Sequence, residues 1–212
     1  MFVTRASAFA IRMLVPFLLF GVSPAWSQDA EDPGVSSAAI LNDPAAPVAG
    51  NPRGDITIVT FFDYNCPFCK KAEPSLERLV KEDGHIRLVY KDWPILTKPS
   101  VYGAQLALAA KYQGKYDAVH AALMVIPGIK IPEDQMLAAV RGSGADMNRL
   151  DGDLKAHADE IAALLKRNLA QADSLGLQGT PAYLVGHFKV TQALTYEGFK
   201  RAVADARAQA KR

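Results

Sequence analysis

The stretch "FFDYNCPFCKKAEPSL", residues 61–76, contains both cysteines of this 212-residue chain. Cys66 and Cys69 are separated only by Pro67 and Phe68. A disulfide gains most of its stabilising effect by closing a long loop of chain. This pair would close almost none, so stabilisation explains its spacing poorly and redox chemistry explains it better.

The residues on either side predict where the two thiols lie. The apolar run "DITIVTFFDY", residues 55–64, is rich in β-branched and aromatic residues and predicts a buried strand. After the cysteines, apolar residues recur at helical spacing up to Val80, while Lys70, Lys71 and Glu73 fall on the other faces. The pattern therefore predicts a strand followed directly by a helix that begins at the cysteines.

A helix N-terminus suits a reactive thiol at Cys66. The unpaired N–H groups and the macrodipole of the first turn stabilise a thiolate, and Pro67 in that turn removes no hydrogen bond that the helix needs. A thiol with a lowered pKa is both a better-populated nucleophile and a better leaving group. We therefore expect Cys66 to form a mixed disulfide with the substrate. Cys69, one turn further along the helix and facing inward, would then attack and resolve that mixed disulfide.

A metal site is the main alternative for paired cysteines. Zinc needs about four ligands, and the chain offers only two cysteines. Its four histidines show no spacing typical of zinc ligands. We predict no metal. The four histidines are His85, His120, His157 and His187.

The rest of the chain predicts a mixed sheet covered by helices. The segment "HIRLVYKDWP", residues 85–94, predicts a second buried strand, residues 100–175 a helical block, and "PAYLVGHFKV", residues 181–190, a hairpin followed by a last helix. A strand–helix–strand unit favours a parallel pair. The net charge of +2, without a basic run, gives no indication of nucleic acid binding.

The first residues have the pattern of a secretory signal peptide over 1–27. Arg5 and Arg12 precede the short apolar run "MLVPFLLFGV", and Ala25 and Ser27 suit the −3 and −1 positions of a cleavage site. The mature chain would begin near Gln28. An uncleaved membrane anchor is the alternative, but the run is short for a span of about 20 residues. The absence of a cysteine after it excludes a lipoprotein anchor. We expect an exported protein that is not embedded in the membrane, with an extended arm over residues 28–47.

The motif "FFDYNCPFCK" after a hydrophobic strand, then a helical insertion, then "GTPAYLVG" closely resembles the DsbA-like branch of the thioredoxin superfamily, over roughly residues 48–208. The resemblance implies an α/β thioredoxin fold, a mixed β-sheet flanked by helices, with an inserted helical domain. It divides the chain into a first thioredoxin-fold part over 48–97, an inserted domain over 98–175, and a second part over 176–212. That last part would hold the cis-proline loop, the hairpin and the C-terminal helix.

The resemblance further implies that Thr180–Pro181 is a cis peptide beside the active-site disulfide. Proline lacks an N–H and does not pair into a sheet, so the backbone groups of Thr180 would be free to bond an extended substrate segment. An ordinary loop proline before a strand is the alternative.

Two departures from the family pattern, and the threonine before the implied cis-proline, bear on the chemistry. Thr60 stands where many relatives carry a buried acidic residue, six positions before the first cysteine. Proton transfer to the resolving thiol would therefore use water or Asp63, or would be slower. Capping of the turn is an equally good interpretation of Asp63. The Pro67–Phe68 dipeptide lacks the histidine of the strongest oxidases, so we expect the pKa of Cys66 between about 3.5 and about 7. A threonine before the implied cis-proline, here Thr180, is more similar to the reductase and isomerase members of the family than to the prototype oxidase.

The sequence thus predicts a periplasmic thiol–disulfide oxidoreductase that exchanges disulfides with cysteine-containing exported proteins. A dithiol oxidase is the first interpretation, and a reductase or isomerase the second. A peptide-binding chaperone without turnover and a copper-handling thiol protein are alternatives from other classes. No dissociable cofactor is expected beyond the Cys66–Cys69 disulfide, and the resemblance implies a membrane-bound redox partner. Because the chain shows no heptads, we expect a monomer.

Overall fold

The computed structural model describes residue 2 and residues 33–211, so the predicted signal peptide over 1–27 lies outside the described residues. Five strands form one mixed sheet in the order β1-β3-β2-β4-β5. They are β1 Val48–Gly50, β2 Ile56–Phe62, β3 Ile86–Asp92, β4 Ala182–Val185 and β5 Phe188–Val190. The predicted fold class is confirmed.

The pairing of the strands follows from the chain order. β2 and β3 are parallel, with Ile56 opposite Ile86, and the helix between them makes the crossover. β1 pairs antiparallel with β3, and β4 pairs antiparallel with β2 and with β5. The β4–β5 hairpin turns at Gly186, whose φ of +56° suits a residue without a side chain.

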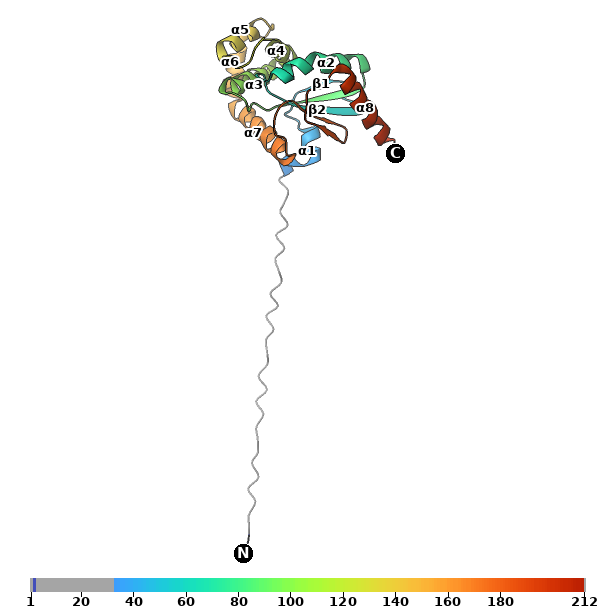
Figure 1. Ribbon diagram of the computed structural model, residues 1–212. Coiled ribbons are helices and arrows are strands. Elements are labelled where there is room, and N and C mark those ends of the chain that lie inside the picture. Colours follow the sequence, from blue (N-terminus) through green and yellow to red (C-terminus); the bar gives the residue numbers. More distant parts are fainter. Residues whose placement is uncertain (1, 3–32, 212) are drawn as a thin grey trace. The chain divides into compact units, whose positions relative to one another are not determined.

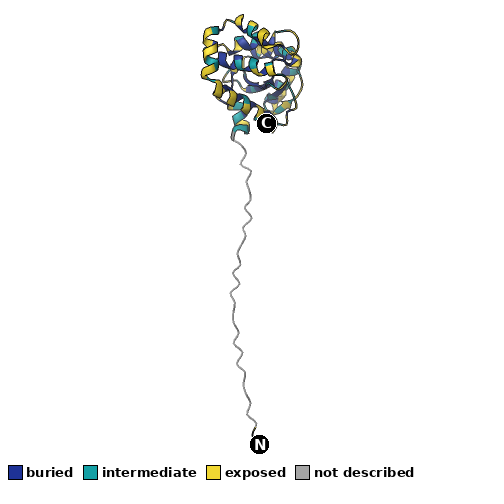
Figure 2. Ribbon diagram, turned by 90° about the vertical axis from the view of Figure 1, so that its left-hand side faces the viewer, coloured by how far each residue is buried: buried dark blue, intermediate teal, exposed yellow. Residues whose placement is uncertain are grey.

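Helices cover both faces of the sheet (Figure 1). α2 and α8 pack on one face, where alternate strand residues such as Ile58 and Phe62 contribute to the larger apolar core. α1 and α7 cover the other face around Val59 and Phe61. Figure 2 shows the strands buried beneath the exposed outer surfaces of the helices. The helices are η1 Pro33–Val35, α1 Ser37–Asn42, α2 Pro67–Asp83, α3 Lys98–Ala110, η2 Lys111–Gln113, α4 Tyr116–Met124, α5 Glu133–Arg141, α6 Met147–Ala156, α7 Ala158–Ser174 and α8 Tyr196–Ala210.

The prediction of an extended arm over residues 28–47 is wrong for the part that the structure describes, because η1 and α1 lie there. The Ser36 hydroxyl accepts a hydrogen bond from the N–H of Ala39 at 3.2 Å and starts α1. Ile40 is then buried against the sheet. This Pro- and Ala-rich segment is therefore helical because Ser36 caps α1 and the buried side chain of Ile40 packs it against the sheet.

The helices α3 to α7 occupy the segment predicted as the inserted domain. The last of them contacts β3 and buries Ala172 in the smaller core. α7 is therefore a covering helix of the sheet as well as the end of the helical segment. Among the described residues, none of the helices combines the length and apolar character that a bilayer crossing requires.

Candidate active site

The two cysteines lie where the central strand β2 passes into helix α2. Cys66 is the N-cap residue of α2, with φ −83° and ψ 115°, and Pro67 occupies the first turn. The N–H of Cys66 donates to the carbonyl oxygen of Asp63 at 3.0 Å, which closes the turn. The N–H of Cys69 donates to Cys66 Sγ at 3.3 Å, so the sulfur takes the place that a capping oxygen usually fills.

Both thiols are free in this structure, and each residue exposes 2% of its surface. Hydrogen bonds from the Cys69 thiol and from the backbone N–H groups of the first turn lower the pKa of Cys66 to about 6, against the opposing effect of burial. Burial, together with the neighbouring Cys66, raises the pKa of Cys69 well above its ordinary value. Two cysteines one turn apart are thus a thiolate and a neutral thiol at pH 7.

The loop before β4 lies against Cys66. The Thr180–Pro181 peptide bond is cis, as the resemblance implied. Cys66 Sγ lies 3.2 Å from the carbonyl oxygen of Thr180, to which it donates in its protonated form. The hydroxyl oxygen of Thr180 is buried and has no hydrogen-bond partner in the part of the chain that the structure describes. The structure therefore brings together Cys66, Cys69, Thr180 and Pro181, all predicted as site residues.

Asp63 is a buried cap of the active-site turn. One carboxylate oxygen accepts from the N–H of Asn65 at 2.7 Å, and the other accepts from the N–H of Leu96 at 2.9 Å. These contacts favour the capping interpretation, and a role in proton transfer stays a prediction. Thr60 is buried inside β2, in register with Tyr90 of β3 and Tyr183 of β4.

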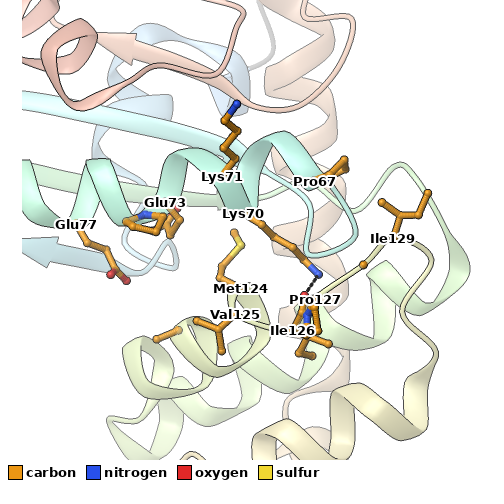
Figure 3. Close-up of a pocket in the computed structure, with 13 residues that line it drawn as sticks. Pro67, Lys70, Lys71, Glu73, Glu77, Met124, Val125, Ile126, Pro127 and Ile129 are labelled. Atoms are coloured by element: carbon orange, nitrogen blue, oxygen red, sulfur yellow. Dashed lines mark hydrogen bonds between the residues drawn. The ribbon is translucent and has the colours of Figure 1, made fainter.

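Two grooves flank the first turns of α2. One, of about 550 Å³, lies between α2 and the cis-proline loop, and the exposed ring of Phe68 borders it. The other, of about 490 Å³, lies between α2 and the segment that follows α4. Figure 3 shows Lys70 reaching across it to the carbonyl oxygen of Ile126, at 2.7 Å, while Lys71 points the other way. Lys70 is therefore anchored at this groove.

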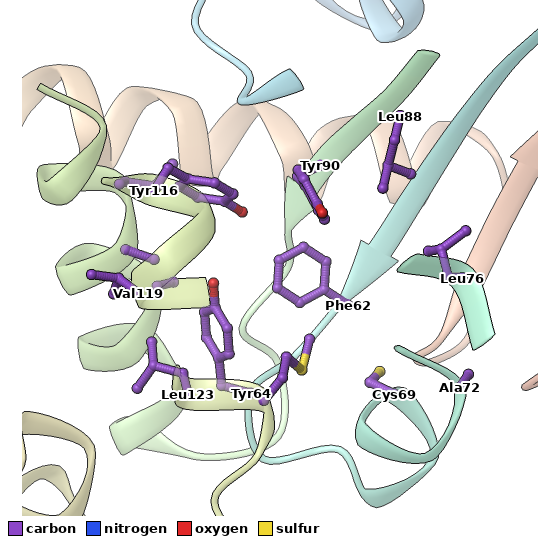
Figure 4. Packing of buried hydrophobic residues seen from close by; sticks show 14 of the residues in the cluster. Phe62, Tyr64, Cys69, Ala72, Leu76, Leu88, Tyr90, Tyr116, Val119 and Leu123 are labelled. Carbon is purple, nitrogen blue, oxygen red and sulfur yellow. The ribbon is translucent and has the colours of Figure 1, made fainter. Parts of the chain in front are cut away.

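A second set of buried polar side chains lies behind the cysteines. His120 of α4 pairs through Nε2 with a carboxylate oxygen of Glu73 at 3.1 Å and through Nδ1 with the hydroxyl of Tyr64 at 3.0 Å. The Tyr116 hydroxyl donates to Asp92 at 2.9 Å. We call Tyr64, Glu73, Asp92, Tyr116 and His120 the buried polar cluster. Figure 4 shows the rings of Phe62, Tyr64, Tyr90 and Tyr116 packed together in this region.

The sequence analysis missed this cluster and placed Glu73 away from the buried face. The helical pattern treats Glu73 as a polar surface residue, yet it is 6% exposed because it points at His120, 47 positions later in the chain. Burial is the largest single effect and opposes the charged form of His120, but the hydrogen bond with Glu73 and the nearby carboxylates together outweigh it and raise the pKa of the imidazole. Only the tertiary contact reveals the pair.

Fold and site define a dithiol protein of thioredoxin architecture. A family model described as "Thioredoxin" matches residues 42–205. The chain belongs to this family, and its structural neighbours are DsbA-like thiol–disulfide oxidoreductases. Three solved structures illustrate the similarity. A thioredoxin-like oxidoreductase from Silicibacter pomeroyi shares 42% identity with a TM-score of 0.76, covering 82% of this chain and 98% of that one.

The other two structures are more distant. A periplasmic thioredoxin-like protein from Salmonella enterica serovar Typhimurium shares 30% identity, with a TM-score of 0.72 over 81% of this chain and 95% of that one. The thiol-disulfide exchange protein alpha-DsbA2 from Wolbachia pipientis shares 26%, with a TM-score of 0.75 over 81% and 93%. Among curated proteins, a Na(+)/H(+) antiporter NhaA 1 from Salinispora arenicola is 29% identical over 163 residues, 75% of this chain. The chain spans about a quarter of the length of such relatives, 24% for this one.

Proposed function

We propose that this chain exchanges disulfides with cysteine-containing exported proteins through Cys66 and acts as a dithiol oxidase. The observation that carries the proposal is the pair of unequal thiols, in which Cys66 has a pKa of about 6 beside a neutral, buried Cys69. A nucleophile or leaving group with this pKa is largely ionised at pH 7.

The oxidising reaction uses two exchange steps. A substrate thiolate attacks Cys66 Sγ in the Cys66–Cys69 disulfide, a mixed disulfide forms, and Cys69 leaves as a thiolate that takes up a proton. A second substrate thiolate then attacks the substrate sulfur of the mixed disulfide and releases Cys66 as a thiolate. The substrate loses two electrons and becomes a disulfide, and the protein gains them as a reduced dithiol.

The energetics of the two thiols favour this direction. An oxidant of this kind is strong because its reduced form is stabilised, and here the donors around Cys66 stabilise the reduced form as a thiolate. The Cys66 pKa of about 6 lies between a value of about 3.5, typical of a strong oxidase, and the value of about 7 found in thioredoxin. A reductase or isomerase is the second candidate, which Thr180 favours.

The proposal extends to place and partners. The periplasm is supported by the similarity to a periplasmic thioredoxin-like protein and by the signal-peptide pattern in the sequence. The redox-active dithiol itself carries the two electrons, so no dissociable cofactor is needed. A membrane-bound redox partner would reoxidise the dithiol between turnovers, and the protein would act as a monomer.

Trapping through Cys66 tests the exchange reaction. The variant Cys69→Ser is expected to accumulate mixed disulfides with cysteine-containing proteins, which dithiothreitol releases, because no resolving thiol remains. The matched variant Cys66→Ser is expected to trap none. Equal trapping by both variants would reject a specific role of Cys66, and trapping by neither would favour a non-covalent binding role.

The reduction potential decides the direction. Equilibration of the wild-type dithiol with glutathione buffers is expected to give a value closer to about −120 mV than to about −270 mV if the protein is an oxidase. A value near the lower figure would assign the chain to the reductases.

A further inference from the structure

Asn65, the residue directly before Cys66, uses every polar atom of its side chain. The carboxamide is 3% exposed. Its Nδ2 group donates to the Thr97 hydroxyl at 2.9 Å and to the Ser100 hydroxyl at 3.2 Å. Its Oδ1 accepts from the N–H of Ile131. One side chain therefore joins the active-site turn to two separate segments of the chain.

Those two segments border the site on the side of the helical insertion. Thr97 is the N-cap of α3 and accepts from the N–H of Ser100 at 3.1 Å. Ile131 ends the loop over residues 125–131, between α4 and α5. The same loop is held a second time where Lys70 of α2 donates to the carbonyl oxygen of Ile126 (Figure 3).

Both segments present large apolar side chains to solvent. Ile95 and Leu96 are 41% and 48% exposed, and Val125 and Ile129 are 77% and 61% exposed. Val125 and Ile129 line the groove of about 490 Å³ that begins at Pro67, the residue next to Cys66. An exposed apolar surface of this kind marks a binding site more often than a bare solvent face.

We infer that Asn65 is a positioning residue for disulfide exchange with polypeptides: its carboxamide fixes Cys66 relative to the two apolar segments, residues 95–97 and 125–131, that contact the chain carrying the substrate thiol. The inference rests on the proposed function and assigns to Asn65 the positioning of Cys66 for that reaction. Asn65 itself touches neither sulfur, because the donors around Cys66 Sγ come from Cys69 and the first turn of α2.

The geometry separates two effects that a purely structural asparagine would not separate. Loss of the carboxamide loosens both segments, which then keep, among the described residues, only the Leu96–Asp63 and Lys70–Ile126 hydrogen bonds to this region, and it leaves the donors to the Cys66 thiolate in place. We therefore expect binding of a polypeptide thiol to weaken while the pKa of Cys66 stays near 6. A small dithiol such as dithiothreitol has no side chains to contact the segments, so its exchange rate should not change.

The experiment compares Asn65→Ala, Asn65→Asp and the matched control Asn148→Ala, an exposed asparagine on α6. The substrates are dithiothreitol and a reduced unfolded polypeptide with apolar residues beside its cysteines. For Asn65→Ala we expect KM for the polypeptide to rise about tenfold. Both kcat and the rate with dithiothreitol should stay within about twofold of wild type, and the pKa of Cys66 within about 0.3. The control should match wild type throughout.

Asn65→Asp should show the opposite separation. The carboxylate keeps an acceptor for the N–H of Ile131, and the hydroxyls of Thr97 and Ser100 can donate to it. KM should stay within about threefold of wild type, while the new negative charge raises the pKa of Cys66. Ser100→Ala, which removes a single partner of the carboxamide, provides a milder variant if Asn65→Ala does not fold, and its KM should rise about twofold to threefold.

Several results would overturn the inference. An unchanged polypeptide KM in both Asn65→Ala and Ser100→Ala would do so. So would an equal loss with dithiothreitol and with the polypeptide, or a shifted Cys66 pKa in Asn65→Ala, because either would place the effect at the thiol or on the fold. Failure of the wild-type protein to exchange with any substrate would instead reject the proposed function.

Discussion

Helix α2 contributes to two buried groups of ionisable side chains, and the two groups differ in how their surroundings stabilise or suppress the charged forms. At the exchange site, defined by Cys66, Cys69, Thr180 and Pro181, hydrogen bonds reach the charged form of one thiol and burial suppresses ionisation of the other. In the buried polar cluster, the ionisable groups are paired with one another, His120 with Glu73 and Tyr116 with Asp92.

Access to the surface is the second difference. The exchange site lies beside the exposed ring of Phe68 and between two grooves. Every residue of the buried polar cluster is at most 6% exposed, and aromatic rings pack around His120 at its centre, with Glu73 also lining a groove. Burial alone therefore does not mark a reactive group. A reactive group is marked by hydrogen-bond donors that stabilise its charged form and by a neighbouring surface where substrate can bind.

The largest effect expected from this comparison concerns His120. The substitution His120→Ala would leave the carboxylate of Glu73 buried without its partner and would empty space among four aromatic rings. Breaking such a pair costs about 3–5 kcal/mol. Urea unfolding at pH 7 should show this loss, while the exchange rate per folded molecule stays close to wild type.

The exposed His187 of the hairpin provides the control for that experiment. His187→Ala should change the free energy of unfolding by no more than about 0.5 kcal/mol. If His120→Ala instead lowered the exchange rate and left the unfolding free energy unchanged, the buried polar cluster would belong to the chemistry and the comparison would fail.

The next effect concerns the exchange site and pH. The pKa of Cys66 falls from an ordinary 9.0 to about 6 on folding, so the folded state binds fewer protons between these values and the reduced protein gains stability as the pH rises from 6 toward 9. The difference corresponds to about 4 kcal/mol at full ionisation. Urea unfolding of the reduced protein, with reduced Cys66→Ser as reference, should show the gain.

Thiolate absorbance at 240 nm gives an independent check of the same group. Its titration midpoint in the reduced wild-type protein should lie near pH 6, and the step should be absent in Cys66→Ser. A midpoint near 9 would remove the electrostatic difference between the two regions.

Asp92 should produce the opposite slope in the buried polar cluster. Burial raises its pKa from 3.8 to about 6, so the folded state holds the proton more tightly and stability falls as the pH rises from about 4 to 6. The full difference corresponds to about 3 kcal/mol. In Asp92→Asn the unfolding free energy should vary less over this window, and a slope equal to that of wild type would contradict the assignment.

The exchange site could be predicted from the sequence because its pattern is local. A buried strand, two cysteines three positions apart and a helical period all fall within residues 55–80, so the place of Cys66 at a helix N-terminus followed directly. The later Thr180–Pro181 entered through the family resemblance, since no local rule joins it to a cysteine 114 positions earlier.

The contacts that join distant segments could not be predicted in the same way. Asn65 pairs with residues 32, 35 and 66 positions later, and Glu73 with one 47 positions later. Strand β1 has only three residues and forms because β3 offers an edge to pair with. Periodicity reports which face of an element is apolar, whereas these features depend on which polar group arrives from elsewhere in the chain.

The smallest effect is expected at Lys91, which is buried on the other face of the sheet and resembles neither region. Its Nζ lies 3.7 Å from a carboxylate oxygen of Asp43 and has no hydrogen-bond partner within the described residues. Burial lowers its pKa to about 8. Asp43 meanwhile accepts two hydrogen bonds from Arg167, at 2.9 and 3.2 Å.

Lys91→Met therefore removes a costly buried charge without leaving Asp43 unpaired. Methionine has a similar length and suits the apolar neighbours Val89 and Trp93 on this face. Replacing a buried ion by an apolar side chain is often neutral or stabilising, so the free energy of unfolding should change by less than about 1 kcal/mol or rise. A loss of unfolding free energy as large as that expected for His120→Ala would mean that Lys91 and Asp43 form a pair that the fold requires. The presence or absence of hydrogen-bond partners would then not distinguish essential buried charges from dispensable ones in this fold.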